Sequence, residues 1–255
     1  MDKTNRPECI SSTKPSFAPP LPPRPQLRYT RAMFTRILGW LARLIVGFFV
    51  LSLVLVIVYR FVPVPVTATM LMDQNGITKD WESLNSIDRN LVSAVIAAED
   101  GKFCVHSGFD TEAIEQAIAE RLSGERERGA STISQQTAKN VFLWQGGGFF
   151  RKGVEAYFTF LIETLWTKRR IMEVYLNVAE TGIGTYGAEA GSLRYFQHSA
   201  NRLSTDEASR MAAALPSPKT RSVVNPGGFT RRYGNTIQAR IGVVRRDALD
   251  ACVYD

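Results

Sequence analysis

The chain has 255 residues, of which 45% are hydrophobic and 22% charged, a composition that suits one compact domain with an appendage. Its formal net charge is +7, and nearly all of the excess lies in residues 1–43, which contain eight basic and two acidic residues. Once Arg60 is also set aside, the remainder is neutral, so the charge gives no reason to expect a nucleic-acid partner.

The excess charge lies beside an apolar segment. Residues 44–59 carry no charge, and extension across Arg60 to Val62 gives about 19 residues, close to the roughly 20 needed to span a bilayer. We therefore predict a transmembrane helix over 38–62. A cleaved signal peptide is the competing interpretation, but the apolar run is long for one, starts late and lacks a small-residue exit site. The basic, Pro-rich residues 1–37 should stay cytoplasmic as a tail, so the domain should face outward.

Three cysteines, Cys9, Cys104 and Cys252, do not form a disulfide framework. Cys9 should lie on the inner side. Cys104 and Cys252 can meet outside, but their spacing does not show it, and two unpaired thiols explain the sequence at least as well. The only histidines are His106 and His198, and the cysteines lack ligand spacing, which excludes a zinc site.

After a linker over 63–84, extended at 62–70 because of Pro63 and Pro65, the pattern from 85 to 255 is mainly helical. Capping residues and apolar periodicity predict several helices with little strand. The first predicted helix covers 88–99 with Asp88 as its cap, and the second begins after Asp110. The third runs from the Thr132–Gln135 capping box to Phe142, and a long helical stretch follows over 151–179, in two pieces that meet near Thr167. The last runs from the Ser204–Glu207 capping box to Pro216.

The pair Glu99 and Asp100 ends the first of these helices. Glu99 is in register with Val92 and Val95, so it should be partly desolvated, which raises the pKa of a carboxyl group and suits it to general-base work. Taken alone, the pair is better explained by a helix end in water. Acids at a helix C-terminus do, however, oppose the helix dipole, which favours a functional reason.

Two further segments can carry chemistry. Thr132, Gln135, Gln136 and Lys139 form one polar stripe, which can line a cleft for an anionic ligand or simply face solvent.

Arg151, Lys152 and Glu155 lie one helical turn apart, as surface ion pairs or as an anion site at a helix start. Around them lies an aromatic cluster that suits either a core or a lipid interface, made of Phe142, Leu143, Trp144, Phe149 and Phe150.

Gly182, Gly184 and Gly187 form a literal G-x-G-x-x-G. The motif follows a predicted helix rather than a strand, and no βαβ unit surrounds it, so a dinucleotide site is rejected. We expect the glycines to turn the chain between two helices.

Together, "EDGKFCVHSGFD", "GASTISQQTAKN", "RKGVE" and "KRRIMEVYLNVAETGIGTYGAEAGSLRYF" resemble, in order and spacing, the peptidoglycan glycosyltransferases. These are the polymerase domains of class A penicillin-binding proteins, and they also occur alone as monofunctional, membrane-anchored enzymes, the type that this chain resembles. The resemblance covers roughly residues 85–220. It implies a mainly α, lysozyme-like fold with a large lobe and a small membrane-associated jaw.

The resemblance also implies an activity, the joining of lipid II units into β-1,4 glycan strands with inversion and release of undecaprenyl pyrophosphate. Glu99 would be the general base, supported by Asp100, and Glu155 the second acid. The remaining roles divide into substrate or pyrophosphate binding, by Asp100, Ser131, Gln135, Gln136, Lys139, Arg151 and Lys152, and structural support, by His106, Asn177 and Gly182.

No organic cofactor is implied, although a divalent cation (Mg or Mn) can join the pyrophosphate at Asp100 or Glu155. The implied partners are lipid II, the growing glycan strand, membrane lipid and other cell-wall synthesis and division proteins. The implied location is the bacterial inner membrane, with a single pass, a cytoplasmic N-terminus and a periplasmic catalytic domain. Cys104 and Gly191 depart from the usual family pattern without removing a proposed catalytic group.

Two rival functions remain. A lysozyme-like enzyme that cleaves glycan would share the fold, but hydrolysis of a neutral glycosidic bond needs no pyrophosphate clamp such as Lys139 and Arg151. An inactive membrane scaffold of the cell-wall machinery would have no need to retain Glu99, Lys139, Arg151 and Glu155.

Overall fold

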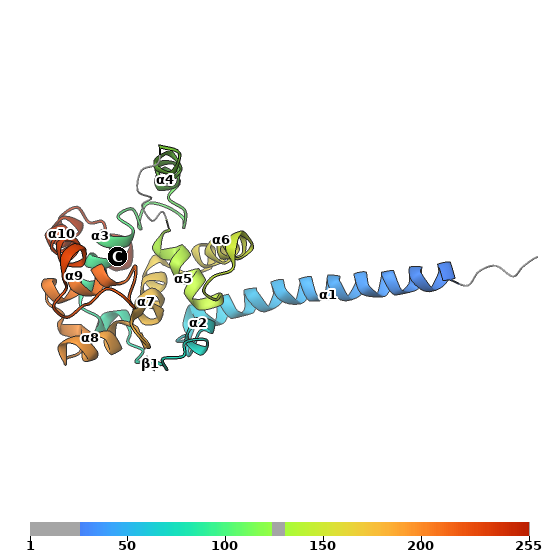
Figure 1. Ribbon diagram of the computed structural model, residues 1–255, viewed down its shortest axis with the longest axis horizontal. Coiled ribbons are helices and arrows are strands. Elements are labelled where there is room, and N and C mark those ends of the chain that lie inside the picture. The colour runs from blue at the N-terminus through green and yellow to red at the C-terminus, as the bar shows by residue number, and fades with distance from the viewer. Residues whose placement is uncertain (1–25, 124–130, 255) are drawn as a thin grey trace, which may run out of the picture. The chain divides into compact units, whose positions relative to one another are not determined.

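The computed structural model describes residues 26–123 and 131–254, which are mainly helical (Figure 1). The Pro-rich stretch 13–25, Cys9 and the charged segment 124–129 lie outside the described residues. The chain divides after Phe49 into an N-terminal unit and a compact unit, Val50–Asp255.

Helix α1 (Gln26–Phe61) begins well before the predicted start at residue 38. Its part from Met33 to Phe61 is, among the described residues, the one helix long and apolar enough to cross a membrane. The C-terminal turns belong to the compact unit, where the Trp166 indole donates to the Val56 carbonyl at 2.7 Å. The Arg170 guanidinium donates twice to the Tyr59 carbonyl, at 3.0 and 2.8 Å. The bonds from Arg170 satisfy a carbonyl that the end of a helix leaves without a partner.

The segment after α1 is less extended than predicted. Residues 62–67 are non-helical, but Thr67 then caps a short helix, α2 (Ala68–Leu71), by accepting from the Met70 N–H. The prediction of an extended chain to Met70 was therefore wrong over its last residues, because a Thr cap outweighs the two prolines upstream. Strand β1 (Thr78–Lys79) and the 3₁₀ turn η1 (Leu84–Ser86) complete the linker.

The predicted caps are present. Asp88 accepts from the Asn90 N–H at the start of α3 (Arg89–Glu99), and Asp110 accepts from the Ala113 N–H in α4 (Thr111–Ser123). Both halves of the capping boxes form at α5 (Ile133–Phe142) and α9 (Thr205–Ala214). The long helical stretch divides at Thr167, as predicted, into α6 (Gly148–Leu165) and α7 (Lys168–Val178). The remaining helices are α8 (Ala188–Phe196), η2 (Ala200–Arg202), α10 (Gly228–Arg246) and α11 (Ala251–Tyr254).

The glycine-rich segment does more than turn the chain. It forms a hairpin of β2 (Glu180–Gly182) and β3 (Thr185–Tyr186), and β1 pairs with β3 in parallel, giving the order β1-β3-β2. Gly184 has φ of +64°, and a Cβ there would lie 2.8 Å from the Asn75 carbonyl oxygen. The segment does turn the chain between two helices, α7 and α8, as predicted. The strand pairing was not predicted, because it needs backbone from the distant linker.

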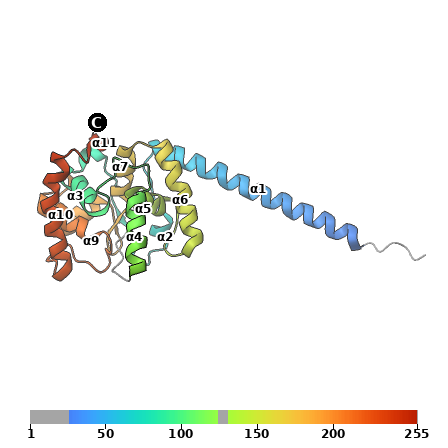
Figure 2. The ribbon, with the colours of Figure 1, turned by 90° about the horizontal axis from the view of Figure 1, so that it is seen from above.

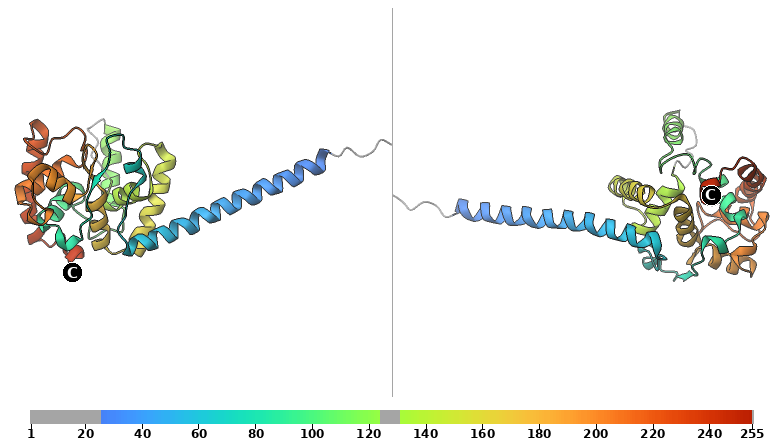
Figure 3. Two further views of the ribbon diagram at one scale, coloured as in Figure 1. Left: turned by 90° about the horizontal axis from the view of Figure 1, so that it is seen from below. Right: turned by 180° about the vertical axis from the view of Figure 1, so that it is seen from behind.

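The helices gather in two groups, α3 with α9 and α10, and α5 with α6 and α7 (Figures 1 and 2). Helix α4 stands off from both groups, as the view from behind in Figure 3 shows. The C-terminal end of α3 faces α5 between the groups, since Gln136 of α5 donates to Glu99 of α3. This contact places the predicted base opposite the predicted polar stripe.

Candidate active site

Glu99 is the last residue of α3, a helix whose residues Leu91 to Ile96 are all buried. Its Oε2 accepts a hydrogen bond from the Gln136 side-chain amide at 2.8 Å, whereas its Oε1 is buried with no partner among the described residues. Burial raises the pKa of Glu99, and the Gln136 bond and the charges of Arg221 and Lys139 oppose this rise. A desolvated carboxyl group with one oxygen free is suited to accept a proton.

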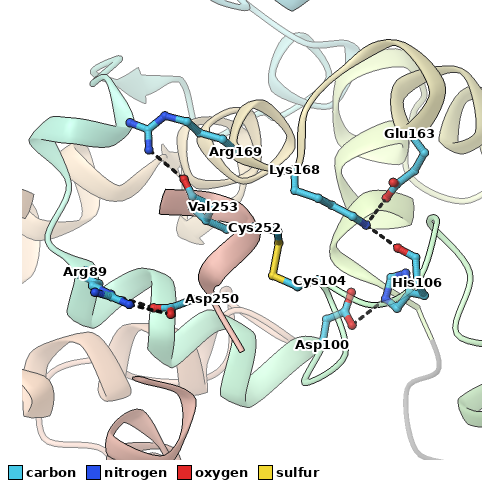
Figure 4. Close-up of a disulfide and its surroundings, with 10 residues drawn as sticks. All are labelled: Arg89, Asp100, Cys104, His106, Glu163, Lys168, Arg169, Asp250, Cys252 and Val253. Carbon is cyan, nitrogen blue, oxygen red and sulfur yellow. Dashed lines mark hydrogen bonds and ion pairs between the residues drawn. A yellow bond between two sulfur atoms is a disulfide. The ribbon is translucent and has the colours of Figure 1, made fainter. Parts of the chain in front are cut away.

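Asp100 directs both oxygens into the protein (Figure 4). Oδ2 accepts from the Ile133 N–H at 3.0 Å, at the start of α5, and Oδ1 lies 2.9 Å from His106 Nε2. Because His106 Nδ1 accepts from the Gly108 N–H at 3.1 Å, the ring proton is on Nε2, and the imidazole donates to Asp100. Asp100 and His106 therefore join the end of α3 to the start of α5.

The polar stripe on α5 is split by the fold. The Gln135 side chain is buried in the capping box, where its oxygen accepts from the Thr132 N–H at 3.0 Å, rather than lying along a cleft. Gln136 remains between Glu99 and the Tyr175 hydroxyl, and Ser131 is exposed, with its hydroxyl 3.4 Å from Lys152 Nζ. Of the two predicted glutamines, only Gln136 contacts the candidate base.

The Lys139 side chain is partly buried, and its ammonium group makes no hydrogen bond or ion pair with another described residue. Burial lowers its pKa, with further lowering by the charges of Arg151 and Lys152 and opposition from Glu155. A desolvated ammonium group without a partner is costly to hold in place. An anionic ligand would supply the missing partner.

Glu155 lies about two turns into α6 and is only 2% exposed. Arg151 Nη1 pairs with its Oε2 at 2.8 Å, and Lys152 Nζ pairs with its Oε1. The Arg151 Nε is buried without a partner. Lys139, Arg151 and Lys152 thus outnumber the one acid among them, and the excess positive charge is what a pyrophosphate site requires.

A cleft of about 580 Å³ opens beside this cluster, with Gln136 and Lys139 on its wall. Beyond them, the cleft is lined by a polar set that the sequence did not indicate, Asp73, Tyr186, Glu180 and Lys219. Asp73 accepts from the Tyr186 hydroxyl at 2.7 Å and from Lys219 Nζ at 3.1 Å. These bonds, together with two from Asn75, lower the pKa of Asp73 well below its usual range. The four residues come from three distant segments without periodic spacing, so no local pattern could have grouped them.

Asn177 and Gly182 hold the frame. Asn177 is buried, accepts from the Glu82 N–H and donates to the Glu82 and Glu173 carbonyls, each at 2.8 Å. A Cβ at position 182 would lie 1.8 Å from the Tyr195 hydroxyl oxygen. The Tyr195 side chain can therefore keep its place only if residue 182 is glycine.

The predicted aromatic cluster is divided between core and surface. Leu143 is buried, and the Phe142 ring stacks on Phe158 with centroids 4.4 Å apart. Phe149 and Phe150, by contrast, are 98% and 76% exposed at the start of α6, directly before Arg151. An interfacial surface at this place therefore rests on these two rings and Trp144, not on the whole cluster.

A divalent cation finds no ready site among the residues that the structure describes. No group of three or more His, Cys, Asp or Glu side chains is arranged to hold one. Asp100 already accepts from two N–H groups, and Glu155 is paired with two cations, so neither of the predicted positions offers a free carboxylate. The donors present do not fit a resident metal ion.

Comparison with known proteins gives concordant results. The family model described as Transglycosylase matches residues 67–241. A biosynthetic peptidoglycan transglycosylase of Caulobacter vibrioides is 50% identical over 203 residues, covering 78% of this chain and 89% of that relative. A relative with the same name from Rhodospirillum centenum is 45% identical, over 88% of this chain and 99% of its own length. Another, from Pseudomonas aeruginosa, is 47% identical, over 83% of this chain and 93% of its own length.

Proposed function

Since the chain belongs to the transglycosylase family and catalyses peptidoglycan glycosyl transfer, we propose that it polymerises lipid II into β-1,4-linked glycan strands with Glu99 as the general base. The observation that carries this proposal is the buried Oε1 of Glu99, which lacks a partner while Lys139 acts on the same carboxyl group. A free base beside an excess of positive charge is what glycosyl transfer from a pyrophosphate donor needs.

In this mechanism the acceptor sugar hydroxyl gives its proton to Glu99 as its oxygen attacks the anomeric carbon of the donor. The bond from that carbon to the pyrophosphate oxygen breaks on the opposite face, so the configuration inverts. Lys139, Arg151 and Lys152 hold the pyrophosphate and stabilise the charge that develops on it. Glu155 orients Arg151 and Lys152 through its two ion pairs, and Asp100 orients the start of α5. The step requires no organic cofactor, and any cation would arrive with the pyrophosphate.

A lipid-linked substrate suits the surface next to this clamp. Phe149 and Phe150 are exposed in the turn that leads into Arg151 and Lys152. Aromatic rings at the level of lipid headgroups, followed at once by cations for a pyrophosphate, match a molecule whose lipid tail begins at its pyrophosphate. We place this edge of the domain against the membrane.

The topology follows from two independent features. The basic residues before α1 favour a cytoplasmic N-terminus, so α1 would anchor the chain in the inner membrane with the domain outside. Cys104 and Cys252 form a disulfide, and disulfides persist in oxidising compartments such as the periplasm. Both features support a periplasmic location for the catalytic domain.

The test uses the full chain in detergent with labelled lipid II and analysis of product length. We expect long glycan strands from the wild type and none above background from Glu99→Gln. If the wild type instead shortens preformed strands, the glycan-cleaving function is correct. If it neither builds nor cleaves, the scaffold function is favoured and the proposal fails.

A further inference from the structure

The loop that follows the base, here called loop 101–108, has no regular secondary structure and consists of turns and bends. The conformation of such a segment depends on the points at which its residues are fastened. One of these points is Cys104, which is bonded to Cys252 of α11, 148 positions later in the chain. The disulfide therefore ties the C-terminal end of the chain to the loop beside Glu99 (Figure 4).

The C-terminal end is held in place without the disulfide. Asp250, which is fully buried, accepts from Arg89 Nε at 2.9 Å and Nη2 at 2.8 Å, at the first residue of α3. The Val253 carbonyl accepts from Arg169 Nη1 at 2.8 Å, near the start of α7. Because these bonds lie on both sides of Cys252, they present it to loop 101–108 as a fixed attachment point.

On its other side, loop 101–108 reaches the base through His106. His106 donates to Asp100, Asp100 accepts from the Ile133 N–H, and Ile133 begins the helix whose Gln136 donates to Glu99. The backbone of the loop is also held at the His106 carbonyl, which accepts from Lys168 Nζ at 2.7 Å. A series of hydrogen bonds through His106, Asp100 and α5 therefore connects loop 101–108 with Glu99.

We propose that the Cys104–Cys252 disulfide is a positioning element for Glu99, so that glycosyl transfer depends on the redox state of this pair. The inference rests on the proposed role of Glu99 as the base. Both cysteines are partly exposed, so a small dithiol can reach them. One thiolate of the dithiol attacks a sulfur of the pair and forms a mixed disulfide, which its second thiol then resolves. Two electrons and two protons pass to the cysteines, and the dithiol becomes a disulfide.

Loss of the tie should affect the chemical step more than binding. We expect kcat to fall about tenfold and KM to change less than about twofold, because a small displacement of a base from its reactive position lowers the rate strongly. Gln136 lowers the pKa of Glu99, so a looser Gln136 bond should move the acidic limb of the rate profile to higher pH. The other titratable and charged groups that face Glu99 are Asp100, Lys139 of α5, Tyr175 of α7, Tyr233 of α10, and Arg221, which precedes α10.

The experiment compares the oxidised full chain, the same protein treated with dithiothreitol, and the double variant Cys104→Ser with Cys252→Ser, all assayed on lipid II across pH. Reduction should bring the wild type to the kcat and acidic limb of the double variant, and should leave the double variant unchanged. Circular dichroism of the reduced wild type tests whether the fold is retained, and this measurement keeps the test decisive if the double variant does not fold.

Arg169→Gln removes the bonds to Val253 and Asn85 and leaves the disulfide in place, so it weakens the attachment point by itself. It should move kcat and the acidic limb in the same direction as reduction does, but by less, because Cys252 stays bonded to a loosened α11. The control variant is Arg246→Gln, which removes the exposed ion pair with Asp247 and should change neither kcat nor the acidic limb. Equal kcat and equal pH profiles for the oxidised, reduced and double-variant proteins would overturn the inference. An oxidised wild type that leaves lipid II unpolymerised would instead overturn the proposed function, and this inference with it.

Discussion

The two acids of the candidate site, Glu99 and Glu155, sit in opposite electrostatic surroundings. Glu99 has one amide hydrogen bond, one buried oxygen without a partner and a raised pKa due to burial. Glu155 is more deeply buried, and each of its oxygens is paired with a cation. The same side chain therefore keeps one oxygen free to accept a proton in one place and has both oxygens paired with cations in the other.

This difference separates a reactive group from an anchoring group. A base needs a free oxygen to accept a proton during the reaction, and Arg151 and Lys152 occupy both oxygens of Glu155. A clamp must keep its cations in fixed positions, which an unpaired Glu99 cannot do. The comparison assigns proton transfer to the end of α3 and charge placement to the start of α6.

The largest effect is expected at Glu99. Glu99→Gln should lower kcat by about a thousandfold, in the range of a lost general base, with little change in KM. Because the pKa of Glu99 is higher in the folded state than in the unfolded state, the native state loses stability as the pH rises from the unfolded-state pKa to the folded-state pKa. Above the folded-state pKa the whole cost of ionised Glu99 is present. The variant should therefore melt at the same or a higher temperature at neutral pH, as scanning calorimetry can measure. Glu115→Gln on the exposed face of α4 is the matched control and should change neither quantity.

Glu155→Gln should cost less activity and more stability. The substitution leaves Arg151 and Lys152 without their shared anion, and we expect a loss of about 1–3 kcal/mol in the free energy of unfolding. This lies below the roughly 3–5 kcal/mol of a broken buried pair because Lys152 is 46% exposed. We expect kcat/KM to fall about tenfold to a hundredfold through misplaced cations. Chemical denaturation and the lipid II assay measure the two effects. A variant as inactive as Glu99→Gln but fully stable would contradict the division of roles.

Lys139 and Lys152 extend the comparison to the cations. Lys139→Met should raise the melting temperature, because burial lowers the pKa of Lys139 and its charged form costs the native state free energy at neutral pH. It should also weaken donor use by about tenfold or more, since a charge-assisted phosphate contact is lost. Lys152→Met, at a half-exposed position paired with Glu155, should lower the melting temperature instead. The same sign of the temperature change in both variants would refute this contrast.

The smallest effect is a shift in pH dependence. The Gln136 amide bond lowers the pKa of Glu99, so Gln136→Leu should raise that pKa and move the acidic limb of kcat upward by about half a pH unit to one unit. The basic limb should stay where it is. A rate profile measured from acid to neutral pH checks this, and a downward shift would show that Gln136 does not act on the base.

Helix boundaries could be predicted from the sequence because capping is a local event. Asp88, Asp110, Thr132, Thr167 and Ser204 each bond a backbone N–H within three positions, so a short window contains both partners. The apolar run before Pro63 is equally local, and it does form one helix long enough to cross a membrane. For the same reason, order and spacing of the four motifs were enough to indicate the family.

The rest depended on contacts between distant residues. Whether Cys104 and Cys252 would pair was open in the sequence and is settled by the packing of α11 against α7 beside loop 101–108. Pairing of the linker with the glycine-rich hairpin turned a predicted turn into a small sheet. Periodicity places Gln135 and Gln136 almost alike, yet one is used in a helix cap and the other contacts Glu99.

The sequence by itself determined where the helices begin and which family motifs they carry, because those signals lie within a few residues. Only the tertiary structure decided which carboxylate stays free and which is paired, because burial and charge partners come from segments that meet only in the folded chain.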